Sequence, residues 1–263
     1  MQQALHSHEV SERIIRTHIP FDLDNGIAHR AAIGVIVLAS DHTIEHEFRT
    51  FLDIDGVAYY ESRIPNSPTV TPESLAAMEQ HLPHCAEIIL PGVPLDVVAY
   101  GCTSASMVIG EARVFERIHE TRPEAKCTTP ITAAFAAFEA LNAKNLAVLT
   151  PYRQDVNDKV ADYIEARGFN VVAFGSFNEE DDNRAAKISS ESIRNAAVEI
   201  GLNDNVDLVF VSCTSLRVAS VIQQIEKETG KPATSSNHAL AWHCLRLAGV
   251  QDKRPEFGQL YMI

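Results

Sequence analysis

The chain has 263 residues, of which 46% are hydrophobic and 22% charged, and its formal net charge is −13. This is the composition of a globular protein that can form one large domain or two smaller ones. The acidic balance argues against nucleic acid or an anionic membrane as a partner, because either would require a basic surface. No apolar run reaches the ~20 residues of a membrane span. The first residues lack the apolar centre of a signal peptide, so we expect a cytoplasmic protein.

The first half of the chain alternates short apolar segments with amphipathic ones. Residues 1–30 have no clear period, and we predict an extension that packs on the body or on a partner subunit of a homo-oligomer. The run IGVIVLAS at 33–40 is apolar and β-branched, as in a buried parallel strand. We predict further strands at 57–64 and 95–101, and helices at 41–52, at 72–90 and from about residue 104.

The second half continues the alternation after Pro130. We predict strands at 145–151, 170–177 and 206–213, and helices at 131–143, 156–168, 189–202, 218–230 and within 231–249. Strands that alternate with helices over the whole length indicate an α/β fold with parallel sheets and right-handed crossovers.

An internal repeat divides the chain into two similar units. The apolar strand that begins at Ile33 recurs at Asn145, a shift of 112 residues, and YGCTSAS at 100–106 recurs as VSCTSLR at 211–217. We therefore predict an N-terminal extension followed by two α/β lobes, at residues 1–30, 31–140 and 141–263. Ligands of open α/β sheets bind beyond the carboxyl ends of the strands, so both Cys-Thr-Ser elements would face one cleft between the lobes.

The two repeated cysteines, Cys102 and Cys213, are the candidate catalytic residues. Five cysteines without a C-x-x-C pair do not form a disulfide framework in a reducing compartment. A cysteine between a strand and a helix lies near free N–H groups and the positive end of the helix dipole, which would lower its pKa. One thiolate and one thiol on opposite sides of a substrate can perform acid/base chemistry. The neighbouring hydroxyls and N–H groups would bind a carboxylate, at Thr103, Ser104, Thr214 and Ser215.

These elements resemble the aspartate/glutamate racemase superfamily. The resemblance rests on the two Cys-Thr-Ser elements, on TPY at 150–152 and on SSNHALAWH at 235–243, and spans roughly residues 30–250. The most similar branch holds maleate cis-trans isomerases, arylmalonate decarboxylases and ectoine-utilisation proteins. It implies two Rossmann-like lobes related by a pseudo-twofold axis, an active site in the cleft between them, and no metal or organic cofactor.

The resemblance also implies roles for single residues. Cys102 would act as nucleophile and Cys213 as acid/base, and Tyr152 would bind the carboxylate. Arylmalonate decarboxylases have glycine at the first cysteine position, so Cys102 favours isomerisation or racemisation. Where maleate isomerases have an asparagine after the first strand, this chain has Asp41, which would repel a dianion. The Asp-x-Thr-Ile-Glu run is similar to the ectoine-utilisation branch, in which Asp41 would pair with a cationic ring substrate.

Alternative interpretations stay open at this point. A decarboxylase would use Cys213 alone as proton donor, and a non-catalytic protein would bind a small carboxylate in the same cleft. Asp41, His42, Glu45 and His46 lack the full metalloprotease signature, so we expect no metal there. No G-x-G-x-x-G element indicates a nucleotide cofactor. Asn237 either caps a helix or contacts substrate, and the acidic run 179–182 is interpreted as a solvated loop.

Overall fold

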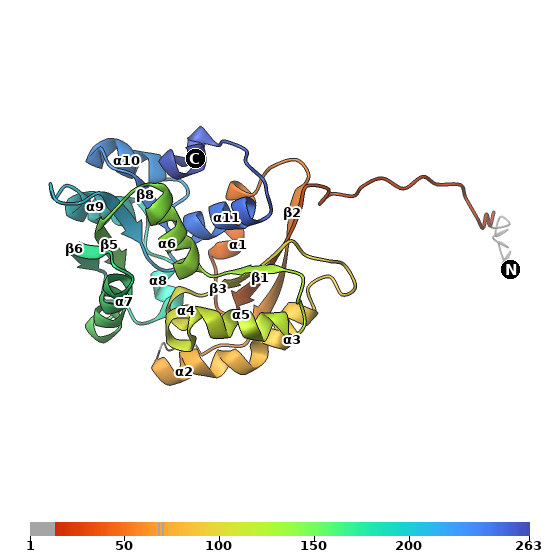
Figure 1. Ribbon diagram of the computed structural model, residues 1–263, viewed down its shortest axis with the longest axis horizontal. Coiled ribbons are helices and arrows are strands. Elements are labelled where there is room, and N and C mark those ends of the chain that lie inside the picture. Colours follow the sequence, from red (N-terminus) through yellow and green to blue (C-terminus); the bar gives the residue numbers. More distant parts are fainter. Residues whose placement is uncertain (1–13, 68, 70) are drawn as a thin grey trace, which may run out of the picture.

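The computed structural model describes residues 14–67, 69 and 71–263 and contains two parallel sheets (Figure 1). The first sheet has the order β2-β1-β3-β4, with β1 Ala31–Leu38, β2 Val57–Ile64, β3 Val97–Gly101 and β4 Lys126–Thr128. The second has the order β6-β5-β7-β8, with β5 Asn145–Thr150, β6 Asn170–Ser176, β7 Leu208–Val211 and β8 Ala233–Ser235. The identical strand order is the structural form of the sequence repeat, and the predicted α/β fold is confirmed.

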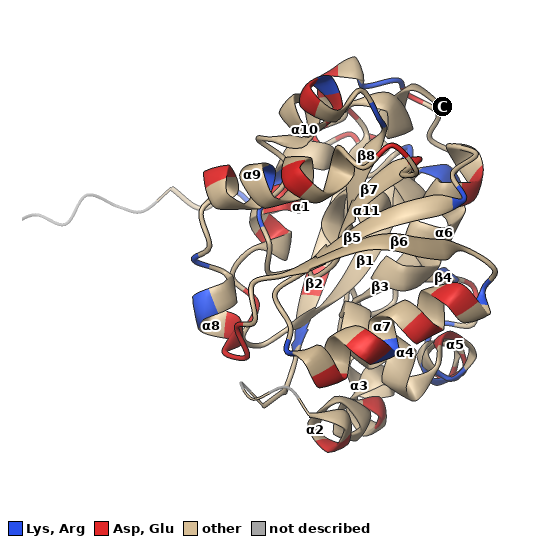
Figure 2. Cartoon of the chain, turned by 90° about the vertical axis from the view of Figure 1, so that its left-hand side faces the viewer, with Lys and Arg blue, Asp and Glu red and all other residues tan. Residues whose placement is uncertain are grey.

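The helices cover both faces of each sheet (Figure 2). In the first half they are α1 Ile44–Phe51, α2 Pro72–Ala76, η1 Ala77–His81, α3 Leu82–Glu87, α4 Thr103–Ile109, α5 Glu111–His119 and α6 Pro130–Ala140. In the second half they are α7 Gln154–Ala166, α8 Asp182–Ala185, α9 Ser190–Gly201, α10 Ile222–Thr229, α11 Ser236–Leu247, η2 Pro255–Phe257 and η3 Gln259–Met262. The single helix predicted at 72–90 is wrong. It is divided into α2, η1 and α3, and Pro83 lies at the start of α3, where it has no N–H to continue a preceding helix.

The sequence of the central strand β1 is apolar on both faces, and the packing around the strand explains why. All eight of its residues are buried. Ile33, Val35 and Val37 pack in a core shared with α1, α6 and α11, whereas Ile36 and Leu38 pack on the opposite side against α2–α5. Because both faces of the strand meet helices, an uninterrupted apolar run is the stable pattern.

Two helices, α6 and α11, join the sheets. Phe135 and Phe138 of α6 pack in the core of the second sheet, whereas Ala133 and Ala137 of the same helix pack with the first. Helix α11, from the second half of the chain, packs in the core of the first sheet and contacts α6 (Figure 1). Each half thus gives one helix to the other, and the lobe boundaries at 140 and 141 stay a prediction.

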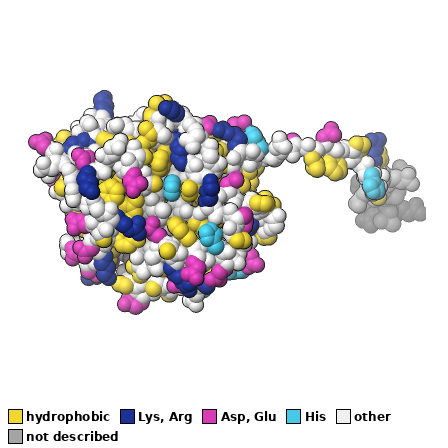
Figure 3. All heavy atoms as spheres, viewed as in Figure 1, with side chains coloured by type: hydrophobic (Ala, Val, Ile, Leu, Met, Phe, Trp, Pro, Cys, Tyr) yellow, Lys and Arg dark blue, Asp and Glu magenta, His cyan; other side chains and the backbone are white. Residues whose placement is uncertain are grey.

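The N-terminal arm extends away from the body (Figures 1 and 3). Its apolar side chains are exposed between 67% and 88%, at Ile14, Ile15, Ile19, Phe21, Leu23 and Ile27. Residues 1–13 of the predicted extension lie outside the described residues. Residues 14–27 do not pack on the body, and contact with a partner subunit stays a prediction. Within the described ranges, no helix is both long and apolar enough to cross a membrane.

We expect Phe138→Ala to lower the free energy of unfolding by about 3–5 kcal/mol, because it leaves a cavity where α6 meets the second sheet. The Phe138 ring is fully buried and lies 5.2 Å from the Phe210 ring and 5.3 Å from the Phe169 ring. Urea denaturation measures the loss. The control Leu202→Ala removes a side chain that is 57% exposed and should change stability by less than about 0.5 kcal/mol. Equal effects of the two substitutions would contradict the bridging role of α6.

Candidate active site

Both repeated cysteines line one cavity between the two sheets. They lie at the carboxyl ends of β3 and β7, which is where an α/β sheet binds its ligands. The cavity is lined by Leu38, Asn66, Ser67, Ser74, Leu75, Met78, Cys102, Thr103, Ser104, Tyr152, Asp182, Cys213, Thr214 and Ser215. Seven of the eight side chains that the sequence singled out for catalysis or binding therefore lie together, and Asp41 is the one that does not line the cavity.

Cys102 is positioned by an ordinary strand-to-helix turn. The strand ends at Gly101, where a Cβ would come within 2.7 Å of Ile44 Cδ1 and 3.2 Å of the Ile36 carbonyl oxygen. Cys102 is then the N-cap of α4, in extended conformation, and its carbonyl oxygen accepts the backbone N–H of Ser106 at 3.2 Å. Its Sγ lies 3.8 Å from the Ser104 hydroxyl. The thiol therefore projects from the sheet edge into the cavity.

Cys213 adopts a strained backbone conformation. Its φ is +143°, a region that residues with a Cβ rarely occupy and that costs of order 1–3 kcal/mol. No helix follows it directly, since α10 begins only at Ile222. The helix predicted from about residue 104 corresponds to α4, and the helix predicted at 218–230 corresponds to α10, so of the two cysteines Cys102 alone is followed directly by a helix. Instead, the N–H of Ser215 points at the Cys213 sulfur at 3.4 Å.

Ser236 connects the two cysteine segments. This residue begins α11 and is fully buried. Its hydroxyl oxygen accepts the Cys213 N–H at 3.0 Å and the Thr103 hydroxyl at 2.9 Å. A displacement of either cysteine segment would therefore disturb the other.

A buried carboxylate, Glu47, holds the segment that follows Cys213. Its Oε1 accepts the N–H groups of Val218 and Ala219, each at 2.6 Å. Its Oε2 accepts the side-chain amide of Asn237 at 3.1 Å, and the same amide donates to the Thr214 carbonyl at 2.7 Å. Burial raises the pKa of Glu47 to about 7, against these three hydrogen bonds, which favour the charged form. The sequence left two roles open for Asn237, as a helix cap or as a substrate contact. The structure favours neither, because the Asn237 amide fixes the Cys213 segment.

The thiols are held in the protonated form, contrary to the pKa shift predicted from the helix dipole. Burial raises the pKa of Cys102 to about 11 and that of Cys213 to about 12, and the nearby Asp182 carboxylate raises both further. The seven residues of α4 give a small dipole, and Cys213 has no adjoining helix. Desolvation of the thiolate therefore outweighs the N–H groups that favour it.

Asp182 is a site residue that the sequence interpretation missed. It lies at the start of α8, in the acidic run interpreted as a solvated loop, yet it lines the cavity together with Cys213 and Tyr152. Its carboxylate accepts the Ser215 hydroxyl at 2.6 Å and the Ser40 hydroxyl at 3.1 Å. Asp181, its neighbour, caps α8, and nothing in the run of four acids marks which one turns to the cavity.

Asp41 does not line the cavity and lies just before α1, whose N-cap is Thr43. Its Oδ1 accepts the N–H groups of Thr43 at 2.6 Å and Ile44 at 2.8 Å. Burial raises its pKa to about 6, although these N–H groups and the Thr214 hydroxyl favour the charged form. The neighbouring His42 contacts Asn183, and Glu45 pairs with Arg63, so this run serves the fold. Among the described side chains, no group of three or more His, Cys, Asp or Glu is arranged to hold a metal.

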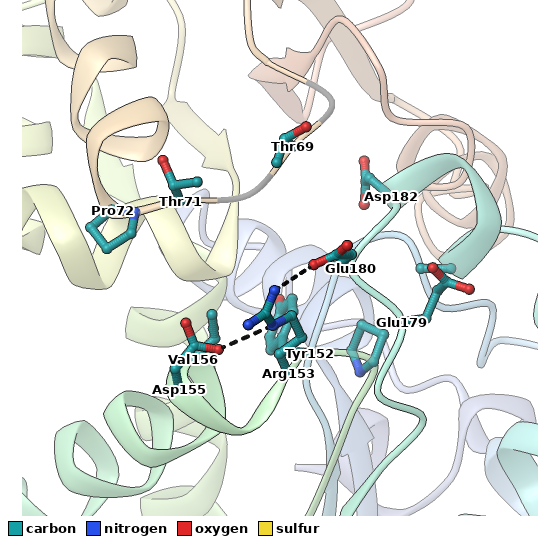
Figure 4. A pocket seen from close by; sticks show the side chains of 12 residues that line it. Thr69, Thr71, Pro72, Tyr152, Arg153, Asp155, Val156, Glu179, Glu180 and Asp182 are labelled. Carbon is teal, nitrogen blue, oxygen red and sulfur yellow. Dashed lines mark hydrogen bonds and ion pairs between the residues drawn. The ribbon is translucent and has the colours of Figure 1, made fainter.

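Tyr152 connects the cysteine cavity to a second, adjoining one. The Tyr152 hydroxyl lies against Cys213 and favours its thiolate, while its backbone is fixed by the Asn157 amide at 2.9 Å. Tyr152 and Asp182 line both cavities. The second cavity also has Arg153, which lies between Asp155 and Glu180 (Figure 4), at 3.6 and 2.8 Å.

A sequence model of the arylmalonate decarboxylase family matches residues 68–261. The chain belongs to the arylmalonate decarboxylase family. The maleate isomerase of Nocardia farcinica is 29% identical over an alignment of 238 positions that covers 87% of this chain and 94% of that protein. The structure of Nocardia farcinica maleate cis-trans isomerase bound to TRIS has a TM-score of 0.81 at 27% identity and covers 88% of this chain and 98% of that one.

A further structure of the Nocardia farcinica enzyme, with one cysteine replaced by serine, holds a covalently bound succinylcysteine intermediate. It matches this arylmalonate decarboxylase family member with a TM-score of 0.81, at 27% identity. The predicted superfamily branch and the prediction that the chain is an enzyme are confirmed. Since its relatives include cysteine-dependent isomerases as well as decarboxylases, the two thiols of this family member are the groups to test first.

In this family member, we expect Glu47→Ala to lower the free energy of unfolding by about 3–5 kcal/mol and to reduce turnover, because three buried donors lose their acceptor. Chemical denaturation and initial rates measure the two effects. Glu45→Ala is the matched control on the same helix. Glu45 pairs only with the partly exposed Arg63 and Arg49, so its loss should cost less than about 1 kcal/mol. A Glu47→Ala protein as stable as the control would refute the holding role.

We also expect both site thiols to react slowly with iodoacetamide at pH 7, because their raised pKa values leave little thiolate. The rate should rise about tenfold per pH unit up to the pKa. Peptide mass spectrometry separates the labelling of Cys102 and Cys213 from that of Cys127, and glutathione is the reference thiol. Labelling of either site cysteine as fast as glutathione at pH 7 would contradict the burial argument.

Proposed function

We propose that this chain is a cofactor-independent isomerase or racemase of a small carboxylate, with Cys102 and Cys213 as its catalytic residues. The observation that carries the proposal is that both thiols line one cavity, each from a different half of the chain. A substrate bound between them would meet one sulfur on each side. Two groups in opposite proton states are what acid/base chemistry on carbon requires.

Two reaction routes use this pair. In isomerisation, the Cys102 thiolate forms a C–S bond with one alkene carbon while the Cys213 thiol gives its proton to the other carbon. Rotation about the resulting single bond follows, and then the proton returns to Cys213 and the C–S bond breaks. In racemisation, one thiolate removes a proton from the carbon beside the carboxylate and the opposite thiol delivers one. The covalent succinylcysteine of the Nocardia farcinica enzyme supports the first route.

The carboxylate of the substrate is bound by neutral donors in this proposal. The Thr103 hydroxyl donates to Ser236 and the Ser215 hydroxyl donates to Asp182. We therefore expect the Ser104 hydroxyl and the backbone N–H group of Thr103 to contact the carboxylate first. The hydroxyls of Tyr152 and Thr214 and the Ser215 N–H would exchange their present contacts with Cys213 and Asp41 for it. The Asp41 carboxylate lies outside the cavity lining and adds a negative charge to the surroundings of the cavity.

The substrate is one of those that the resemblance suggests: maleate, a ring acid of ectoine type, an arylmalonate, a hydantoin or an amino acid. A cytoplasmic location is supported by the five cysteines, all of which are free. We also propose a homo-oligomer, which the exposed apolar side chains of the N-terminal arm support. A decarboxylase that relies on Cys213 alone is the competing function, because the matched family model carries that activity in its name.

We expect Cys102→Ala and Cys213→Ala each to lower kcat by about 10³-fold or more, since each removes a group that has no substitute in the cavity. Turnover of the substrate and circular dichroism, as a check of folding, measure the effect. Cys244→Ala is the matched control, because Cys244 is buried in the core away from the cavity. Full activity of both site variants would sink the proposal. Activity retained in Cys102→Gly, but lost in Cys213→Gly, would establish the decarboxylase instead.

A further inference from the structure

The cysteine cavity has a carboxylate and no cation on its wall. Among its described lining residues, Asp182 is the one charged side chain, and the others are apolar, hydroxyl, thiol or amide groups. Its carboxylate accepts only two neutral hydroxyls, from Ser40 and Ser215. A substrate with two carboxylates would therefore enter next to a negative charge that nothing on the cavity wall compensates.

A second carboxylate lies close by and is incompletely paired. Asp41 is 4% exposed, and its Oδ2 is buried without a hydrogen-bond partner of good geometry in the described part of the chain. The Asp182 carboxylate helps to raise the pKa of Asp41, and both carboxylates help to raise the pKa of the Cys102 thiol, although burial is the larger cause in each case. Like charges that share a site in this way are stabilised by a cation placed between or beside them.

The adjoining cavity extends the negative region. Its wall carries Asp155, Glu179 and Glu180 in addition to Asp182, and Arg153 is the only basic residue among the described residues that line it (Figure 4). The Arg153 guanidinium is already paired with Asp155 and Glu180, and Glu179 is paired with Arg184, so among the described residues Asp182 is the one carboxylate of this wall that forms no ion pair. A molecule that passes through this cavity to the cysteines therefore experiences a field that attracts cations.

We propose that the substrate carries a protonated nitrogen, an ammonium or an amidinium, beside its carboxylate, and that Asp182 binds this group. The inference rests on the proposed function and names its substrate class, a zwitterionic carboxylate such as an α-amino acid or a cyclic amidinium acid. Its carboxylate lies against the neutral hydroxyls, and its cation lies against Asp182. Asp182 thereby determines specificity against dicarboxylates.

The charge arrangement also connects substrate binding to thiol activation. Asp182 raises the pKa of both Cys102 and Cys213. A bound cation neutralises that effect and itself favours a thiolate. A zwitterionic substrate therefore promotes the reactive form of the thiol on arrival, whereas a dianion opposes it.

Calorimetric titration tests the proposal with three ligands: maleate as the dianion, glutamate as an α-amino acid, and ectoine as a cyclic amidinium acid. We expect the wild-type protein to bind at least one of the two zwitterionic ligands more tightly than maleate. Asp182→Asn should weaken that binding by roughly 10- to 100-fold, the range for a charged hydrogen bond, and should strengthen maleate binding. The variant should also speed alkylation of both cysteines at pH 8.

Asp162→Asn is the matched control. It makes the same change of charge at an exposed position of α7, outside the residues that line either cavity, and should leave all three affinities unchanged. Maleate binding to the wild-type protein as tight as, or tighter than, that of both zwitterions overturns the proposal, and this comparison does not depend on how any variant folds. Binding of neither zwitterion overturns it too.

The outcome is distinguishable from a failure of the proposed function. If the wild-type protein converts maleate and the Cys102→Ala and Cys213→Ala variants do not, the two-cysteine function stands and the cation site is refuted. If zwitterion binding depends on Asp182 but turnover does not depend on the cysteines, the cation site stands and the function is refuted.

Discussion

The geometry of the site depends on how the segment after Cys213 is held. A backbone at φ +143° does not stay there by itself. It is fixed from outside, by the Glu47 carboxylate on two N–H groups, by the Asn237 amide on the Thr214 carbonyl, and by the Ser236 hydroxyl on the Cys213 N–H. Glu47 comes from the first half of the chain and the other two from α11, which packs on the first sheet. The second cysteine is therefore held by groups of two helices, α1 and α11, that pack on the first sheet.

The packing of α11 on the first sheet is therefore important for the geometry of the site. Because α11 crosses to the first sheet, Ser236 at its start can accept both the Thr103 hydroxyl and the Cys213 N–H. The two cysteine segments are thus fixed to one atom rather than to two separate lobes. Rigid elements keep reacting groups within the narrow range of positions that catalysis on a small substrate requires.

The electrostatic environment of the cavity disfavours the thiolate form of both cysteines. Both thiols are desolvated and lie near Asp182, so the neutral thiol is favoured. A positive charge placed nearby would favour the thiolate. The family relatives include enzymes named for maleate, a dianion. The negative charge on this cavity wall is the reason why we do not assign the same substrate to this chain. Family membership indicates the fold, whereas the pair of sulfur atoms and the charge of the cavity wall come from this chain's own residues.

The sequence by itself determined the α/β class, the repeat and the pair Cys102 and Cys213, because strand and helix periodicity and a repeated tripeptide are local patterns. It also placed Thr103, Ser104, Tyr152, Thr214 and Ser215 at the right edge of the sheets. Only the tertiary structure decided that Asp182 turns inward, that Asp41 lies outside the cavity lining and that Glu47 holds the Cys213 segment, since these follow from contacts between residues up to 190 positions apart. The thiol pKa values likewise depend on burial by several elements at once, which no local motif encodes.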